Sequence, residues 1–182
     1  GGDAFVGLAA GEAVVEIVAA AVLQLVEDGV DALKVPRVAA DLGVTKGGFY
    51  RRFADRAALL EAMLERWRVG RATAIAQQTS LDEQAPRERL KALIQLYSER
   101  LNPEGMAIEL AIRQWARSDE GAAAAVASVD AARLKHVGEL YRAAGLAAHG
   151  ARPWQIALTA PVIAHAFVDS LHAPDGSPGA TS

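Results

Sequence analysis

The sequence has 182 residues, of which 52% are hydrophobic and none is cysteine, and its formal net charge is −3 at pH 7. The lack of cysteine excludes disulfide bonds, thiol catalysis and zinc sites built on cysteine. Much of the hydrophobic content is alanine, and period-two runs of β-branched or aromatic residues are lacking, so we expect an all-α chain of one or two domains.

No apolar segment is long enough to cross a membrane, which takes about 20 residues. The most apolar one, residues 14–26, is interrupted by Glu16 and Gln24, and no positively charged segment precedes it as in a secretory signal. We therefore expect a soluble cytoplasmic protein that has no membrane partner.

Four helices are expected in the first part of the chain. Gly29 is suited to end the first, and Pro36 is suited to the first turn of the second. Thr45 and Asp55 are good capping residues for the third and the fourth. Together with the hydrophobic spacing, these signals predict helices over residues 12–28, 36–42, 46–52 and 55–77.

The polar residues 78–85 are interpreted as a hinge, after which Pro86 restarts the helical pattern. That helix is expected to bury Leu90, Leu93, Ile94 and Tyr97. The next helix has a strong start, because Asn102 can cap it, Pro103 fits its first turn and Glu104 complements its dipole.

Two more long helices are expected before the C-terminal tail. One begins at residues 118–120 and ends near Gly145, with apolar residues spaced mostly three or four apart. The last covers residues 153–172 and is expected to kink or break near Thr159, because Pro161 lies inside it. The tail, residues 174–182, is rich in Gly, Pro and Ser and is expected to be disordered.

Positive charge is concentrated around the short third helix. Residues 34–71 hold nine basic and four acidic side chains, a net charge of +5, whereas the rest of the chain holds ten basic and eighteen acidic ones, a net charge of −8. On charge alone, this fits either a nucleic-acid surface or chance clustering on solvated helix faces.

Residues 35–53, VPRVAADLGVTKGGFYRRF, combine a helix, a tight turn and a second short helix, which is the pattern of a helix-turn-helix. The second helix of such a unit enters the DNA major groove with its N-terminus first. Gly47 and Gly48 lack side chains, so this helix start can approach a duplex closely. Phe49 and Phe53 are expected to face inward and hold the helix in place.

We predict that DNA is contacted by nine residues in and around this unit. The basic side chains can reach phosphates or base edges, Thr45 can cap the helix or donate to a phosphate, and Tyr50 can offer its hydroxyl group to the backbone. The predicted contacts are Lys34, Arg37, Thr45, Lys46, Gly47, Gly48, Tyr50, Arg51 and Arg56.

Residues 12–67 resemble the DNA-binding domain of the TetR/AcrR family of transcriptional regulators. The residues that carry this resemblance are Glu27-Asp28-Gly29, Val38-Ala39, Leu42-Gly43-Val44-Thr45-Lys46-Gly47, Tyr50, Phe53, Arg56 and Leu59-Leu60. Lys34 departs from the pattern, because the family usually has a capping threonine or serine there. The resemblance implies a three-helix helix-turn-helix domain with its connecting helix in residues 1–77. It also implies a helical ligand-binding and dimerisation domain in residues 78–182.

The resemblance further implies a homodimer whose C-terminal domains each hold a small-molecule cavity. The expected function is that of a ligand-responsive repressor, which binds a pseudo-palindromic double-stranded DNA operator and is released by a small effector. Residues 121–127 and 157–166 are small-residue stretches that suit the dimer contact. An apolar or aromatic effector is favoured, because no arginine cluster or phosphate-binding loop is evident in the second half.

The candidate effector-binding residues are large apolar side chains and one amide, although each also suits an ordinary core position. They are Trp67, Tyr97, Met106, Leu110, Gln114, Trp115 and Phe167.

Metal and catalytic sites are not expected. His165, Asp169 and His172 could share a helix face, but a polar stripe at a surface or interface explains them better, and the same holds for His136 and Glu139. No set of residues suited to catalysis appears, so we expect no cofactor and no enzymatic activity. The alternatives are an all-helical small-molecule-binding protein or enzyme that retains a helix-turn-helix shape, and a constitutive DNA-packaging protein without a ligand.

Overall fold

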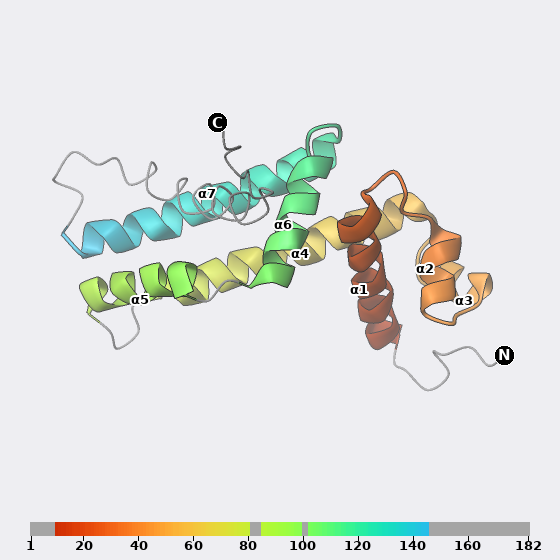
Figure 1. Cartoon of the computed structure of the whole chain (residues 1–182), viewed down its shortest axis with the longest axis horizontal. Helices are drawn as coiled ribbons and strands as arrows, with labels where there is room; N and C mark the ends of the chain where they lie inside the picture. Colours follow the sequence, from red (N-terminus) through yellow and green to blue (C-terminus); the bar gives the residue numbers. More distant parts are fainter. Residues whose placement is uncertain (1–9, 81–84, 100–101, 146–182) are drawn as a thin grey trace, which may run out of the picture. The chain divides into compact units, whose positions relative to one another are not determined.

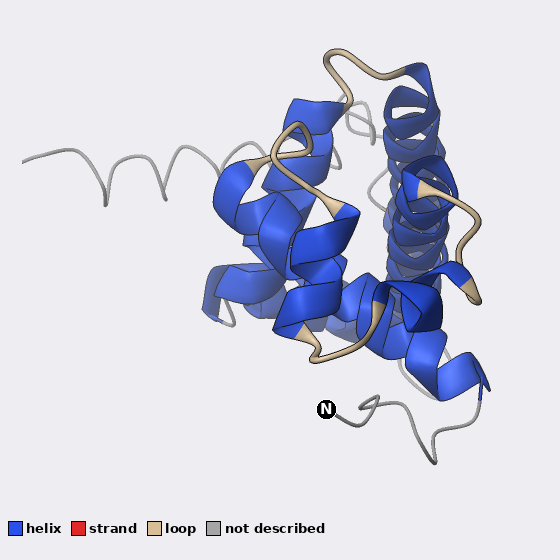
Figure 2. Ribbon diagram, turned by 90° about the vertical axis from the view of Figure 1, so that its right-hand side faces the viewer, coloured by secondary structure: helices blue, strands red, loops and turns tan. Residues whose placement is uncertain are grey.

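A computed structural model of the chain describes residues 10–80, 85–99 and 102–145 (Figure 1). These residues form seven α-helices and no strand (Figure 2), which confirms the all-α prediction for this part of the chain. None of these helices is long and apolar enough to span a bilayer. The helices are α1 (Ala10–Asp28), α2 (Val35–Asp41), α3 (Lys46–Tyr50), α4 (Arg56–Thr79), α5 (Pro86–Glu99), α6 (Pro103–Trp115) and α7 (Glu120–Ala143).

The chain divides into two compact units, and the boundaries between them fall within α4 and α7. One unit contains residues 1–74 and 102–129, and the other contains residues 75–101 and 130–182. These units are defined by packing, whereas the domains expected from the sequence are defined by function. The predicted domain boundary at residue 77 is therefore not tested and stays a prediction.

In the first unit, α1 packs against both α2 and α6. Its buried side chains recur every three or four residues, as the helical period requires. Gly29 ends the helix with φ +80°, a left-handed conformation that favours glycine, and its N–H donates to the Leu25 carbonyl at 3.0 Å. The buried residues of α1 are Ala13, Ile17, Val18, Ala21, Gln24 and Leu25.

The predicted helix starts are confirmed by their capping bonds. The side chains of Asp55, Asn102 and Asp119 each accept a hydrogen bond from the backbone N–H three residues later, at 2.8, 3.1 and 2.8 Å. Some helices in the structure end about two residues away from the ends predicted from the sequence. In particular, α3 ends at Tyr50 rather than residue 52, and α4 continues to Thr79 into the segment expected to be a hinge.

The second unit has its own small core, in which Leu90 and Leu93 of α5 pack with Val137 and Leu140 of α7 and with Ala144, which directly follows that helix. The prediction that Ile94 is also buried is wrong, since it is 54% exposed. Leu90 and Leu93 already fill the narrow stripe that faces this cluster, and Ile94 lies to one side of it. The Nε group of Arg87 adds a 3.2 Å hydrogen bond to the Ala144 carbonyl.

Several predictions concern residues outside those that the structure describes. They are the helix over 153–172 with its kink near Thr159, the dimer stretch 157–166, the tail 174–182, the ligand candidate Phe167 and the polar set His165, Asp169 and His172.

Candidate nucleic-acid interface and ligand region

The turn between α2 and α3 is fixed by Gly43. This residue has φ +65°, where a side chain would be strained. The Val44 N–H donates to the Ala39 carbonyl at 2.9 Å, and Val38, Ala39 and Val44 are buried. Since α2 and α3 also pack together, residues 35–53 form the predicted helix-turn-helix.

The start of α3 is capped as predicted, because Thr45 Oγ accepts a hydrogen bond from the Gly48 N–H at 3.0 Å. The two glycines differ in their surroundings. Gly48 is buried, whereas Gly47 is exposed, and a Cβ at Gly47 would come no closer to another group than 4.0 Å from Thr45 Oγ. The fold therefore does not require a bare surface at Gly47.

Two phenyl rings support α3 from inside, as predicted. Phe49 and Phe53 are both buried, and their ring centroids are 5.6 Å apart. Tyr50 meets the edge of Phe49 at a centroid distance of 5.4 Å but remains 52% exposed. The recognition helix thus has an apolar back and a front that presents a phenol to solvent.

The basic residues predicted to contact DNA fall into two groups. Lys34 and Lys46 are exposed and have no ion-pair partner among the described residues, and Lys34 begins α2 without a side-chain cap. Arg37 is also exposed, but it hydrogen-bonds Asp28 and lies 3.5 Å from Glu27, and the Asp28 bond raises the pKa of its guanidinium. The Nε group of Arg51 donates to the Gly47 carbonyl at 3.3 Å.

Arg56 has an additional contact that sequence reasoning missed. Its Nε donates to the Leu33 carbonyl at 2.8 Å, and its Nη2 donates to the Val30 carbonyl. The side chain therefore ties the start of α4 to the loop between α1 and α2. Backbone carbonyls more than 20 residues away leave no mark in the sequence, so no pattern could have indicated this contact.

The candidate effector residues within the first unit lie on α4 and α6. Trp67 and Trp115 are buried, Met106 and Leu110 are half-buried, and Gln114 is exposed. The side chain of Tyr97 is outside the described part. Their shared location on two helices is compatible with one site.

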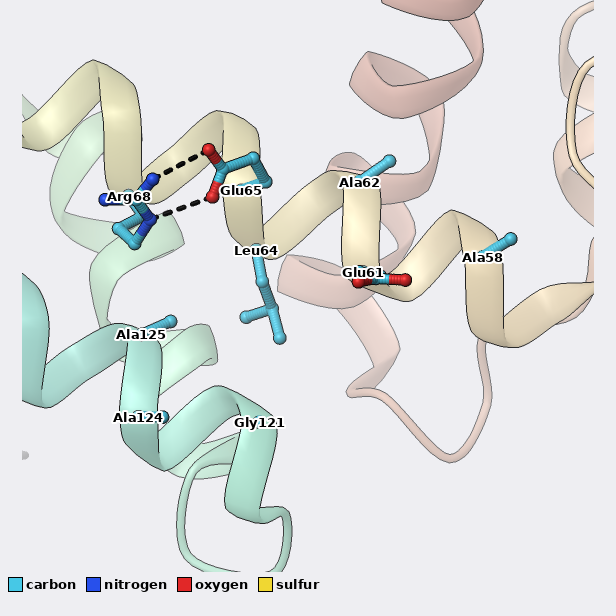
Figure 3. Close-up of a pocket in the computed structure, with 9 residues that line it drawn as sticks. All are labelled: Ala58, Glu61, Ala62, Leu64, Glu65, Arg68, Gly121, Ala124 and Ala125. Atoms are coloured by element: carbon cyan, nitrogen blue, oxygen red, sulfur yellow. Dashed lines mark hydrogen bonds and ion pairs between the residues drawn. The ribbon is translucent and has the colours of Figure 1, made fainter.

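A groove of about 640 Å³ lies between α4 and α7 in the first unit (Figure 3). None of the predicted effector residues lines it, although three residues of the expected dimer stretch do. On its wall, Glu65 forms a two-point ion pair with Arg68 at 2.7 and 2.8 Å, which lowers the pKa of Glu65. The lining consists of Ala58, Glu61, Ala62, Leu64, Glu65, Arg68, Gly121, Ala124 and Ala125.

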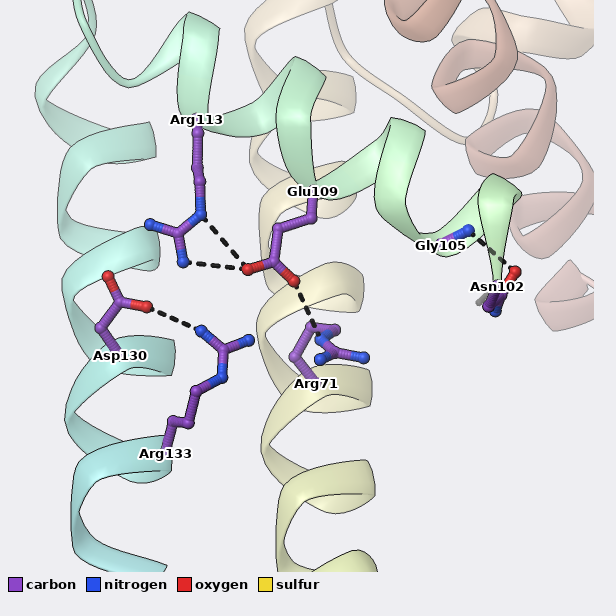
Figure 4. Close-up of polar contacts among 7 residues, drawn as sticks. All are labelled: Arg71, Asn102, Gly105, Glu109, Arg113, Asp130 and Arg133. Carbon is purple, nitrogen blue, oxygen red and sulfur yellow. Dashed lines mark hydrogen bonds and ion pairs between the residues drawn. The ribbon is translucent and has the colours of Figure 1, made fainter. Parts of the chain in front are cut away.

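Glu109 on α6 is flanked by two arginines (Figure 4). Arg113 donates two hydrogen bonds to its Oε1, at 3.2 and 2.9 Å, and Arg71 Nε lies 3.5 Å from its Oε2. The Glu109 side chain is only 12% exposed. The sequence did not reveal this pair of arginines, because they lie on different helices 42 positions apart in sequence.

Among the described residues, no group of three His, Asp or Glu side chains is placed to hold a metal ion. His136 Nδ1 and Glu139 Oε2 are 3.9 Å apart on α7. This is the spacing of a surface pair rather than of a coordination site.

A helix-turn-helix with an exposed front and flanking cations is typical of DNA-binding proteins. Residues 17–63 match the family model described as bacterial regulatory proteins, tetR family. Residues 17–63 are thus similar to the DNA-binding domain of TetR-family transcriptional regulators, as the sequence resemblance predicted.

Solved structures share the fold. A TetR-family transcriptional regulator from Rhodococcus sp. is 24% identical, with 88% of this chain and 89% of that one covered and a TM-score of 0.62. The reduced form of NemR from E. coli is 16% identical, with 87% and 88% covered and a TM-score of 0.68. SmeT, the repressor of a Stenotrophomonas maltophilia multidrug efflux pump, is 21% identical, with 89% and 81% covered and a TM-score of 0.59. A comparison with curated proteins finds no match.

Proposed function

We propose that this regulator is a cytoplasmic repressor that binds a pseudo-palindromic operator as a homodimer and releases it when a small effector binds. The observation that carries the proposal is the front of α3. There Gly47 is open and Tyr50 is exposed, while Phe49 and Phe53 hold the helix from behind. A helix that presents a polar front on an apolar support suits insertion into a major groove.

Contacts with phosphates would come from the cations around this front. Lys46 begins α3 and Lys34 precedes α2, and both are exposed without an intramolecular ion pair in the described part of the chain. Neither lysine therefore has to break an existing ion pair to reach a phosphate. Arg37 would first have to exchange its acidic partners for a phosphate, so we expect it to contribute less.

A dimer is proposed because a single recognition helix is too short to contact a whole pseudo-palindromic operator. One short helix covers only a half-site, and a second copy related by twofold symmetry reads the other half. We assign the contact between copies to the C-terminal part, where the small residues 121–127 allow close approach of helices. An effector that prefers the dimer geometry with misplaced recognition helices would shift the population away from the DNA-bound state.

The proposal is tested by selecting duplexes from a random pool with the purified protein and titrating a selected duplex over a salt series. We expect binding of two copies, with log K falling by about 0.9 per log unit of salt for each phosphate neutralised. Tyr50→Phe and Lys46→Ala should both weaken binding, whereas Lys91→Ala, which removes an exposed lysine of α5, serves as the matched control. Unchanged affinity in both test variants, or a flat salt response, would contradict the proposal.

A further inference from the structure

Two buried N–H donors on α4 lack a hydrogen-bond acceptor. Trp67 is only 8% exposed, and its Nε1 is inaccessible to water and unpartnered. The Nε of Arg71 is likewise buried and makes no hydrogen bond. Buried polar groups in folded proteins are nearly always satisfied, so an unpaired donor calls for an explanation. Here two such donors occur on one helix.

The two donors lie on the same side of α4, because residues four apart in an α-helix are neighbours on its surface. Arg71 also faces α6, since it forms an ion pair with Glu109 of that helix. The Arg71 side chain is 28% exposed as a whole, although its Nε is buried. The pair therefore combines a buried donor, Trp67, with a partly exposed cation.

Glu109 does not satisfy Arg71. Its Oε1 is held by both Nε and Nη2 of Arg113, and its Oε2 stays 3.5 Å from Arg71 Nε without a hydrogen bond. The carboxylate thus accepts hydrogen bonds from Arg113 and forms an ion pair with Arg71 without a hydrogen bond to its Nε. An acceptor from a ligand would give Arg71 the hydrogen bond that Glu109 does not.

We propose that Trp67 and Arg71 receive the carboxylate of an acidic effector whose remaining body is apolar. This inference rests on the proposed function and specifies the effector class. Met106 of α6 lies one turn before Glu109, on the same face, and is half-buried, which suits contact with the apolar body. Charge-assisted hydrogen bonds to a carboxylate are the strongest that these donors can make.

Such an effector would also change how α4 is held. Its carboxylate competes with Glu109 for Arg71, which is the ion pair that joins α4 to α6. At its other end, α4 holds the loop between α1 and α2 through Arg56, and α6 packs on α1. Both helices that meet at Arg71 are thus connected to the helix-turn-helix, which gives the ligand a physical route to DNA affinity.

The test compares acids with their neutral amides on the full chain. The probes are 4-phenylbutyrate with 4-phenylbutanamide and decanoate with decanamide, titrated calorimetrically at pH 7.5. We expect each acid to bind about tenfold more tightly than its amide, because only the acid carries a charge for Arg71. Arg71→Gln should remove this preference, and a circular dichroism spectrum like that of the wild type shows that the variant folds. Trp67→Phe should weaken acid binding about fivefold.

Arg68→Gln is the matched control, because Arg68 is an arginine of the same helix whose carboxylate partner is Glu65. It should keep the full preference for the acids. The inference is overturned if the acids do not bind, if acid and amide bind equally, or if Arg71→Gln retains the preference. Release of the selected operator is measured separately. If only the amides release the operator, the proposed function stands and this inference fails. If the acids bind but do not release the operator, this inference stands and the proposed function fails.

Discussion

The recognition segment, residues 45–53, and the ligand region around Trp67 and Arg71 are built in opposite ways. In the recognition segment, hydrogen bonds such as that from Gly48 to Thr45 join residues three or four apart. In the ligand region, the ion pair joins Arg71 of α4 to Glu109 of α6, which are 38 positions apart in sequence. Two buried donors there, Trp67 Nε1 and Arg71 Nε, have no acceptor. The recognition segment is therefore held by local contacts, whereas the proposed ligand region depends on a contact between two helices.

Phe49→Ala would break the recognition segment most severely. Phe49 is fully buried, so the truncation should lower the free energy of unfolding by about 3–5 kcal/mol and abolish operator binding. Urea unfolding monitored by circular dichroism measures the first effect. Tyr50→Ala is the comparison variant, because its ring is half-exposed and should cost less than about 1 kcal/mol. Equal destabilisation by both would show that Phe49 is not the support of α3.

Arg56→Met tests the anchor between α4 and the loop before α2. Loss of two charge-assisted hydrogen bonds to carbonyls should destabilise the protein by about 2–3 kcal/mol, while the salt dependence of operator binding stays unchanged. A phosphate contact, the role predicted from the sequence, would give a different result. Stability would then be unaffected, and the slope of log K against log salt would be shallower by about 0.9.

Gly47→Ala separates the effect of this residue on folding stability from its effect on DNA affinity. Since alanine favours a helix over glycine, the variant should be more stable by about 0.5–1 kcal/mol, because no group lies closer than 4.0 Å to the new Cβ. The same methyl group should weaken operator binding about tenfold by keeping the helix from the duplex. Gly70→Ala, on an open face of α4, should gain similar stability and leave affinity unchanged. Unaltered DNA affinity in Gly47→Ala would refute the close approach.

The contrast also explains what could be predicted from the sequence. The caps at Thr45, Asp55 and Asn102 and the inward rings of Phe49 and Phe53 depend on residues close in sequence, and all were predicted. The anchor at Arg56 and the unpaired donors on α4 depend on the meeting of distant segments, which leaves no periodic pattern. Ile94 was misplaced for a related reason, because helical spacing does not fix the width of the buried stripe.

Photocrosslinking tests the central claim, that the exposed front of α3 meets DNA, most directly. A benzoylphenylalanine is placed at Tyr50 or at Ile94, two positions that are 52% and 54% exposed, and each protein is irradiated with the selected operator. We predict a protein–DNA adduct from position 50 and none from position 94. Adducts from both positions in equal yield, or from position 94 alone, would contradict the claim.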